Sequence, residues 1–177
     1  MSPEIPPSFG DTRPELLILD VDGVLTPNQI FVSEEGGEWK PFFVPDGTGL
    51  KLLLQNGVQV ALISGRPSRA VEHRARELGI AHCETGVRAK GRAVTTLLER
   101  TGVSPSAAVY AGDDLIDLAA MGEVGLPVAV RNAHPEVIRR AVAVTHREGG
   151  RGAVREICEW ILRARGDWEH VLEGYLE

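Results

Sequence analysis

The chain has 177 residues, of which 43% are hydrophobic and 25% charged, as expected for one globular domain with a sizeable core. Its 19 basic and 25 acidic side chains give a net charge of −6, which disfavours nucleic acid and anionic membranes as partners. No apolar run is long enough to cross a bilayer, and the first residues lack the basic and apolar parts of a signal peptide. We therefore expect a cytoplasmic protein in which Cys83 and Cys158 are reduced thiols.

The N-terminal residues 1–14 contain four of the eleven prolines and are predicted to form a flexible tail before a single domain over residues 15–177. The four aliphatic residues 16–19 predict a strand buried on both faces, the kind found in parallel sheets. Asp20 and Asp22 follow it and start on one face, because residues two apart in an extended chain point to the same side. Gly23 allows a sharp turn, so the pair lies at the carboxyl end of a strand, where open α/β sheets bind ligands.

Two carboxylates this close repel each other, and each raises the pKa of the other unless a cation lies between them. A hard divalent cation, Mg²⁺ above all, would remove that repulsion and would also attract phosphate. One aspartate could then act as a nucleophile and the other as a general acid and base. The alternative is a strand followed by an acidic Asp-Gly turn, which many proteins contain.

Residues 28–44 interrupt the expected alternation of strand and helix with a predicted β-hairpin. Apolar residues alternate with others before Gly36 and Gly37, which mark its turn. An apolar hairpin beside a candidate site is either a flap over that site or an assembly surface. We expect the assembly contacts to be made by Ile30, Phe31, Val32, Trp39 and Phe43.

The remaining elements follow in the order of an α/β protein. Spacing and stop signals predict helices over residues 46–56, 67–78 and about 90–100, and strands over 58–63, 80–83, 107–111, 124–130 and 141–144. A long helix follows residues 149–152, and a C-terminal amphipathic segment covers about 166–177. This order predicts a doubly wound parallel sheet, Rossmann-like, with helices on both faces.

Polar side chains at successive strand ends form a candidate catalytic constellation. Besides the first aspartate pair, its members are Ser64, Lys90, Asp113, Asp114 and Asp117. They suit phosphoryl transfer through an aspartate, in which Asp20 attacks while Ser64 and Lys90 hold the phosphate oxygens. Asp113 would complete a Mg²⁺ shell opposite Asp20.

Each of these residues also has a simpler interpretation. Ser64 is plausible as a helix N-cap, Lys90 as a solvated surface charge, and Gly112-Asp113-Asp114 as a turn. All of them together, in this order at successive strand ends, favour the catalytic interpretation. His134, which precedes Pro135, is expected to cap a helix.

The pattern resembles the haloacid dehalogenase superfamily of Mg²⁺-dependent phosphatases. The resemblance rests on Asp20-Val-Asp22-Gly-Val-Leu-Thr26, Ser64, Lys90, and Gly112-Asp-Asp-Leu-Ile-Asp117. It implies that Asp20 is the nucleophile and a metal ligand, and that Asp113 is the remaining side-chain ligand. Asp22 would be the acid and base and would give its backbone oxygen to the metal. The supporting residues would be Thr26, Gly65, Asp114 and Asp117.

A closer resemblance, over almost the whole of residues 16–166, is to the capless 3-deoxy-D-manno-octulosonate 8-phosphate phosphatases. It rests on Asp46-Gly47-Thr-Gly49, Ile63-Ser-Gly-Arg66, Ala133-His-Pro135 and Gly149-Gly-Arg-Gly-Ala-Val-Arg-Glu-Ile-Cys158. The resemblance implies no cap domain, a role in lipopolysaccharide biosynthesis, and a homotetramer in which the hairpin builds the assembly and a neighbour helps close each site. The substrate-binding residues that it implies are Asp22, Pro45, Asp46, Gly47, Lys51, Arg66, Arg74 and Lys90.

The sequence departs from that family at Pro45, where an arginine is usual, and at Thr48, which is often aromatic there. N-acylneuraminate 9-phosphate is therefore the alternative substrate. A switch of another class, the receiver domain, also combines Mg²⁺, a phosphorylated aspartate, a hydroxyl and a lysine, but its phosphorylated aspartate ends the third strand. Here the proposed nucleophile follows the first strand, which favours the phosphatase. A non-catalytic assembly module is disfavoured because every motif position is retained.

Overall fold

The computed structural model describes residues 4–10 and 12–176. Their centre is a six-stranded parallel sheet with the strand order β5-β4-β1-β6-β7-β8. The strands are β1 Leu16–Leu19, β4 Gln59–Ile63, β5 His82–Glu84, β6 Ala108–Gly112, β7 Leu126–Ala129 and β8 Ala143–Val144. Each predicted strand of the sheet is present, with ends shifted by a few residues.

The two innermost strands explain where a site can form. β1 and β6 are completely buried, as the aliphatic run 16–19 predicts, and β1 lies between β4 and β6. Leu19 is in register with Leu62 on one side and with Ala111 on the other. The residues that follow these three strands therefore meet at one edge of the sheet.

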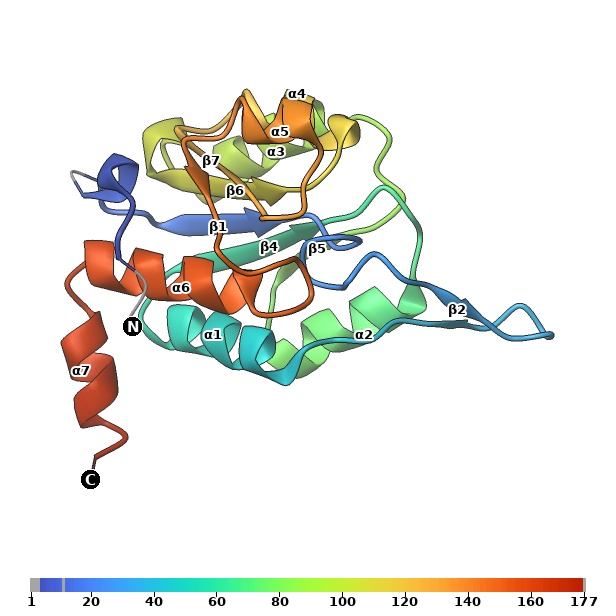
Figure 1. Ribbon diagram of the computed structural model, residues 1–177, viewed down its shortest axis with the longest axis horizontal. Coiled ribbons are helices and arrows are strands. Elements are labelled where there is room, and N and C mark those ends of the chain that lie inside the picture. Colours follow the sequence, from blue (N-terminus) through green and yellow to red (C-terminus); the bar gives the residue numbers. More distant parts are fainter. Residues whose placement is uncertain (1–3, 11, 177) are drawn as a thin grey trace.

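Helices cover both faces of the sheet (Figure 1). On one side lie α1 Val44–Gln55, α2 Arg69–Leu78 and α6 Ala153–Ala164, with α1 packed along α6. On the other lie α3 Lys90–Thr101, α4 Leu118–Met121 and α5 Pro135–Ile138. Short 3-10 turns are η1 Pro7–Phe9, η2 Pro105–Ala107 and η3 Leu115–Asp117. The predicted doubly wound α/β fold is confirmed, and the described residues contain no separate cap domain.

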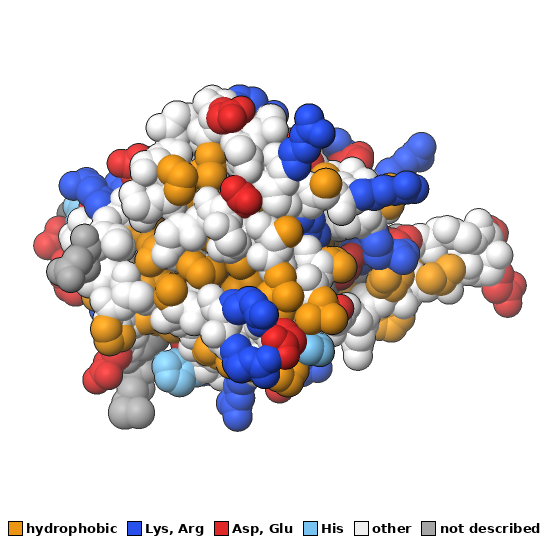
Figure 2. Space-filling view, turned by 90° about the horizontal axis from the view of Figure 1, so that it is seen from above, with side chains coloured by type: hydrophobic (Ala, Val, Ile, Leu, Met, Phe, Trp, Pro, Cys, Tyr) orange, Lys and Arg blue, Asp and Glu red, His pale blue; other side chains and the backbone are white. Residues whose placement is uncertain are grey.

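The predicted hairpin is present and projects from the body of the molecule (Figure 1). Its strands, β2 Phe31–Val32 and β3 Glu38–Trp39, form a separate antiparallel pair. Phe31, Val32 and Trp39 are 58%, 70% and 72% exposed. Figure 2 shows hydrophobic side chains along this projection and acidic ones at its tip.

The two ends of the chain differ in how far they follow the predictions. Instead of forming a flexible tail, residues around η1 pack on the domain. Phe9 is completely buried and forms an edge-to-face pair with Trp160, with 5.9 Å between the ring centroids. Residues 1–3 and 11 of that predicted tail lie outside the described residues. The C-terminal segment contains α7 Trp168–Glu173, in which Trp168 and Val171 are buried while Leu172 is partly exposed.

Among residues 4–10 and 12–176, no helix combines the length and the apolar character needed to cross a membrane.

Candidate active site

The carboxyl edge of the sheet brings together the side chains that the sequence predicts there. Asp20 directly follows β1, Ser64 directly follows β4, and Asp113 directly follows β6. All three are buried, with Asp20 at 3%, Ser64 at 1% and Asp113 at 7% exposure. Because β1 lies between β4 and β6, the candidate nucleophile is central in this row.

Lys90 reaches the same place from the first position of α3. Its Nζ donates to Asp20 Oδ1 at 2.6 Å and to Asp117 Oδ1 at 2.8 Å. The lysine is buried, so the alternative of a solvated surface charge is wrong. Two carboxylates offset its charge, and they raise the pKa of Lys90 against the opposing effect of desolvation.

Asp117 holds Lys90 and the start of the loop after β6 in place through hydrogen bonds. Besides Lys90, its Oδ1 accepts a hydrogen bond from the Tyr110 hydroxyl at 2.7 Å. Its Oδ2 accepts from the backbone N–H groups of Asp113 and Asp114 at 3.0 and 3.2 Å. Four donors occupy the two oxygens, so Asp117 supports the site and has little capacity left to bind a metal.

The cluster carries more negative charge than its surroundings compensate. Burial, and then the charge of Asp117, raise the pKa of Asp20 to about 6. Burial together with Asp20 and Asp117 raises the pKa of Asp113 to about 8. Asp113 Oδ1 is buried with no hydrogen-bond partner among the described residues. An orphaned carboxylate oxygen next to a second carboxylate fits a hard divalent cation.

Carboxylate oxygens of Asp20, Asp113 and Asp117 lie within 4.8 Å of one another, as a metal-binding group requires. The hydrogen bonds of Asp117 leave Asp20 and Asp113 as the side chains of this group that are suited to bind the ion. These are the two side-chain ligands that the sequence predicts.

Asp22 has a partner that the sequence analysis missed. Its Oδ1 is paired with Nζ of Lys40, a hairpin residue whose side chain is fully buried. Lys40 also lies 3.5 Å from Glu38 Oε1. Alternation along the hairpin places residues 38 and 40 on the face opposite that of Trp39, but it does not identify Asp22 as the partner.

Glycines allow the loops around Asp20 to approach one another closely. At Gly23, with φ +101°, a Cβ would lie 2.0 Å from Asp113 Oδ2. At Gly149 a Cβ would lie 1.7 Å from the Gly23 carbonyl oxygen, and the Gly150 N–H donates to Val24 O at 2.8 Å. The turn 149–152 therefore packs on the loop that follows Asp20.

The remaining supporting residues have local structural roles. Thr26 is buried and donates to Val21 O at 3.3 Å, which closes the loop after Asp22. Asp114 caps η3 by accepting from Leu115 N at 2.7 Å. Ser64 does not cap a helix, because the N-cap of α2 is Ser68. The Oγ of Ser64 instead accepts a hydrogen bond from Arg66 N at 3.2 Å, across Gly65. His134 is confirmed as a helix cap, since its Nδ1 accepts from Glu136 N.

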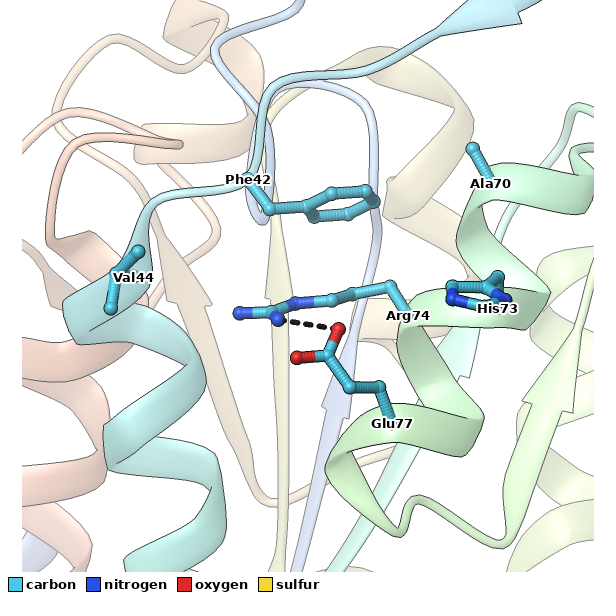
Figure 3. A pocket seen from close by; sticks show the side chains of 6 residues that line it. All are labelled: Phe42, Val44, Ala70, His73, Arg74 and Glu77. Carbon is cyan, nitrogen blue, oxygen red and sulfur yellow. Dashed lines mark hydrogen bonds and ion pairs between the residues drawn. The ribbon is translucent and has the colours of Figure 1, made fainter.

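The predicted sugar-acid residues divide into separate groups. Arg66 pairs with Glu38 at 2.8 Å and remains half exposed. Arg74 extends from α2 between Phe42 and Glu77 (Figure 3). Its Nη1 forms an ion pair with Glu77 Oε2 at 2.8 Å. Its guanidinium borders a pocket of about 430 Å³ lined by Phe42, Val44, Ala70, His73, Arg74 and Glu77. None of the buried carboxylates lines this pocket.

The first turn of α1 borders the same region. Pro45 is exposed there, and a Cβ at Gly47 would lie 2.4 Å from Arg74 Nη2. Lys51, one turn further, is also exposed. Asp46 instead points into the interface with α6, where its Oδ1 accepts from Arg155 N at 2.8 Å. Asp46 therefore caps α6 rather than facing solvent in this structure.

Comparison with known proteins agrees with this geometry. A family model described as haloacid dehalogenase-like hydrolase matches residues 84–157. The 3-deoxy-D-manno-octulosonate 8-phosphate phosphatase of Salmonella typhi is 49% identical over 151 residues, which cover 85% of this chain and 80% of that protein.

Solved structures show the same relationship. The phosphatase of that name from Moraxella catarrhalis, in complex with magnesium ion, phosphate ion and a KDO molecule, matches with a TM-score of 0.91 at 39% identity and covers 95% of each chain. The one from Yersinia pestis matches with a TM-score of 0.88 at 42% identity, over 93% of this chain and 88% of that one. This chain belongs to the 3-deoxy-D-manno-octulosonate 8-phosphate phosphatase family of haloacid dehalogenase-like hydrolases.

Proposed function

We propose that the protein is a Mg²⁺-dependent phosphatase that converts 3-deoxy-D-manno-octulosonate 8-phosphate to the free sugar acid and phosphate. The observation that carries the proposal is the buried cluster of Asp20, Lys90 and Asp113 at one sheet edge, in a chain 49% identical to a phosphatase of that name. Carboxylates and a lysine in this arrangement suit attack on a phosphate monoester.

The roles follow from position. A carboxylate oxygen of Asp20 attacks phosphorus, the bond from phosphorus to the sugar oxygen breaks, and Asp22 gives its proton to that oxygen. Water then attacks the aspartyl phosphate, Asp22 takes up the proton, and Asp20 is regenerated. Lys90, already bonded to Asp20, and Ser64 from the neighbouring strand end hold the phosphate oxygens.

Mg²⁺ would be held by the carboxylates of Asp20 and Asp113 and by the backbone oxygen of Asp22. Asp113 Oδ1, buried without a hydrogen-bond partner among the described residues, fits such a ligand. The ion would supply positive charge against the phosphate and the charge that develops on its oxygens.

Substrate recognition by Arg66, Arg74 and Lys51 is part of the same proposal. Both arginines have carboxylate partners, Glu38 and Glu77, so a sugar acid would have to compete with these or bind beside them. N-acylneuraminate 9-phosphate remains the alternative substrate, because Pro45 supplies no donor where an arginine is usual in the family. The same proposal includes a homotetramer whose subunits contact one another through the exposed hairpin. It also places the protein in the cytoplasm.

The test is phosphate release from a panel of phosphorylated sugars and sugar acids with Mg²⁺ present. We expect octulosonate 8-phosphate to give the highest kcat/KM, and we expect EDTA to abolish turnover reversibly. Asp20→Asn and Asp22→Asn should each lose most activity, by about 100-fold or more. Near-normal turnover by Asp20→Asn would refute the covalent mechanism, whereas preference for a neutral sugar phosphate would refute the substrate assignment.

A further inference from the structure

Lys40 is a buried lysine that the proposed chemistry does not use. Its side chain has no exposed surface, although it belongs to a hairpin that otherwise projects into solvent. A lysine is almost never fully buried without partners, because desolvation of its charge is costly. Its partners are Asp22 and, at 3.5 Å, Glu38.

Glu38 connects this lysine to a second loop of the site. Its Oε1 accepts from the Ser68 hydroxyl at 2.8 Å and its Oε2 from Arg66 Nη2 at 2.8 Å. Both partners lie just before the start of α2, two and four residues after Ser64 in the sequence. Lys40 is therefore fixed from two sides, by the loop of Asp22 and, through Glu38, by the loop that follows β4.

The contact with Lys40 leaves the two oxygens of Asp22 in different surroundings. Oδ1 is bonded to Lys40, whereas Oδ2 has no hydrogen-bond partner within the part of the chain that the structure describes. The side chain of Asp22 is 16% exposed, in contrast to the nearly inaccessible Asp20. One oxygen is thus held by the protein, and the other remains available to a substrate.

We propose that Lys40 is a positioning residue that holds the carboxyl group of Asp22 so that Oδ2 meets the leaving oxygen of the substrate. The inference rests on the proposed function, in which Asp22 transfers the proton. A carboxyl group that rotates freely would present either oxygen in many directions, and misplacement by about 1 Å can cost roughly 100-fold in rate. The hairpin then contributes to the chemistry itself as well as to any assembly surface.

A positioning role predicts a dependence on the leaving group that a merely structural role does not. Proton donation matters most for a sugar alcohol, which is a poor leaving group, and hardly at all for p-nitrophenolate, which leaves unprotonated. Lys40→Met keeps the volume and removes the charged contact. We expect it to lose about 10- to 100-fold in kcat/KM for octulosonate 8-phosphate and less than about threefold for p-nitrophenyl phosphate.

The experiment compares wild type, Lys40→Met, Asp22→Asn and the double variant on both substrates. If Lys40 acts through Asp22, adding Lys40→Met to Asp22→Asn causes no further loss. Glu35→Gln, which removes a charge from the exposed part of the same hairpin, is the control and should match wild type. Circular dichroism and light scattering establish that each variant keeps its fold and assembly, and Lys40→Gln replaces Lys40→Met if the latter does not fold.

Equal losses on the two substrates, or losses that multiply in the double variant, would overturn the positioning role while leaving the proposed function intact. If Asp22→Asn itself keeps full activity on octulosonate 8-phosphate, the proton-transfer role of Asp22 fails, and the role of Lys40 fails with it. A selective loss on the sugar phosphate, absent in the Asp22→Asn background, is the expected result.

Discussion

At the scale of single residues, the site holds buried carboxylates that repel one another electrostatically. Asp20 and Asp113 both have raised pKa values, about 6 and about 8, chiefly because they are buried and next to other carboxylates. A bound divalent cation would lower both values and stabilise the folded state, because it binds the assembled ligands and not the unfolded chain.

We therefore predict that Mg²⁺ raises the melting temperature. At a concentration about 100 times Kd the gain is about 2.7 kcal/mol, or several degrees for a domain of this size. Asp113→Asn should lose most of this increase, whereas Glu35→Gln should keep it. Differential scanning calorimetry with and without Mg²⁺ measures the effect, and an unchanged increase in Asp113→Asn would exclude Asp113 as a ligand.

Asp46 leads to a prediction about pH. Burial raises its pKa from 3.8 to about 6 despite the hydrogen bond from Arg155 N, and its Oδ2 is unpartnered among the described residues. The folded state thus holds this proton more tightly than the unfolded state does, so its stabilising contribution is complete below pH 3.8 and is lost as pH rises through 6. The difference corresponds to about 3 kcal/mol.

Asp46→Asn keeps an acceptor for Arg155 N but does not titrate. Its free energy of unfolding relative to wild type should therefore increase between pH 4 and pH 7, by up to about 3 kcal/mol. Urea unfolding across this range measures the difference, and titrations elsewhere in the chain cancel in it. A pH-independent difference would mean that Asp46 is ionised throughout.

Pro45 gives a prediction about specificity. It lies exposed in the first turn of α1, where proline is well tolerated but supplies no donor. Pro45→Arg should improve kcat/KM for octulosonate 8-phosphate at least severalfold, because a charged hydrogen bond to its carboxylate contributes about 1.5–3 kcal/mol. A neutral sugar phosphate should change little; an equal change for both would mean that position 45 shapes the loop and does not bind the acid.

At the scale of elements, the turn that precedes α6 supports the loop after Asp20. Gly150 has φ +65°, and a Cβ there would lie 2.1 Å from Pro27 N. We predict that Gly150→Ala destabilises the protein by more than about 2 kcal/mol and lowers kcat, since the Asp20 loop must move. Gly57→Ala, at φ +75° with open space around it, is the matched control and should cost only about 1–2 kcal/mol with kcat unchanged. Unfolding experiments and steady-state kinetics distinguish backbone strain at the substituted residue, which both variants have, from a clash with the Asp20 loop, which only Gly150→Ala has.

The same contacts show which parts of the molecule a sequence can predict. The strand over 16–19 and the side chains that follow β1, β4 and β6 were predictable, because buried strands have an apolar signature and parallel strands end at one edge. The pairing of Lys40 with Asp22 and the packing of Gly149 on Gly23 were not, because they join segments with no shared periodicity. Phe9 was missed for the same reason, since its partner Trp160 lies far along the chain.

At the scale of the whole molecule, the hairpin is the feature that the single chain leaves unexplained. Glu38 and Lys40 face the site, and Trp39 between them is 72% exposed, as alternation along a strand requires. Phe31 pairs with Trp39 across the hairpin and is exposed as well. A two-stranded hairpin of this size is marginal by itself, so burying its outer face would also fix its inner face.

We predict that the protein is a homotetramer assembled through this outer face, and that Trp39→Glu reduces both assembly and turnover. The substitution should leave the monomer fold intact because Trp39 makes little contact within the chain, but a charge at the centre of an interface excludes association. Light scattering and kcat/KM for octulosonate 8-phosphate are measured together, with Val142→Glu, a partly exposed residue far from the hairpin in sequence, as the control. If assembly holds Lys40 on Asp22, the loss of turnover follows the loss of tetramer and is reduced at high protein concentration. A wild-type monomer with full activity would show that the hairpin needs no neighbour to hold the acid in place.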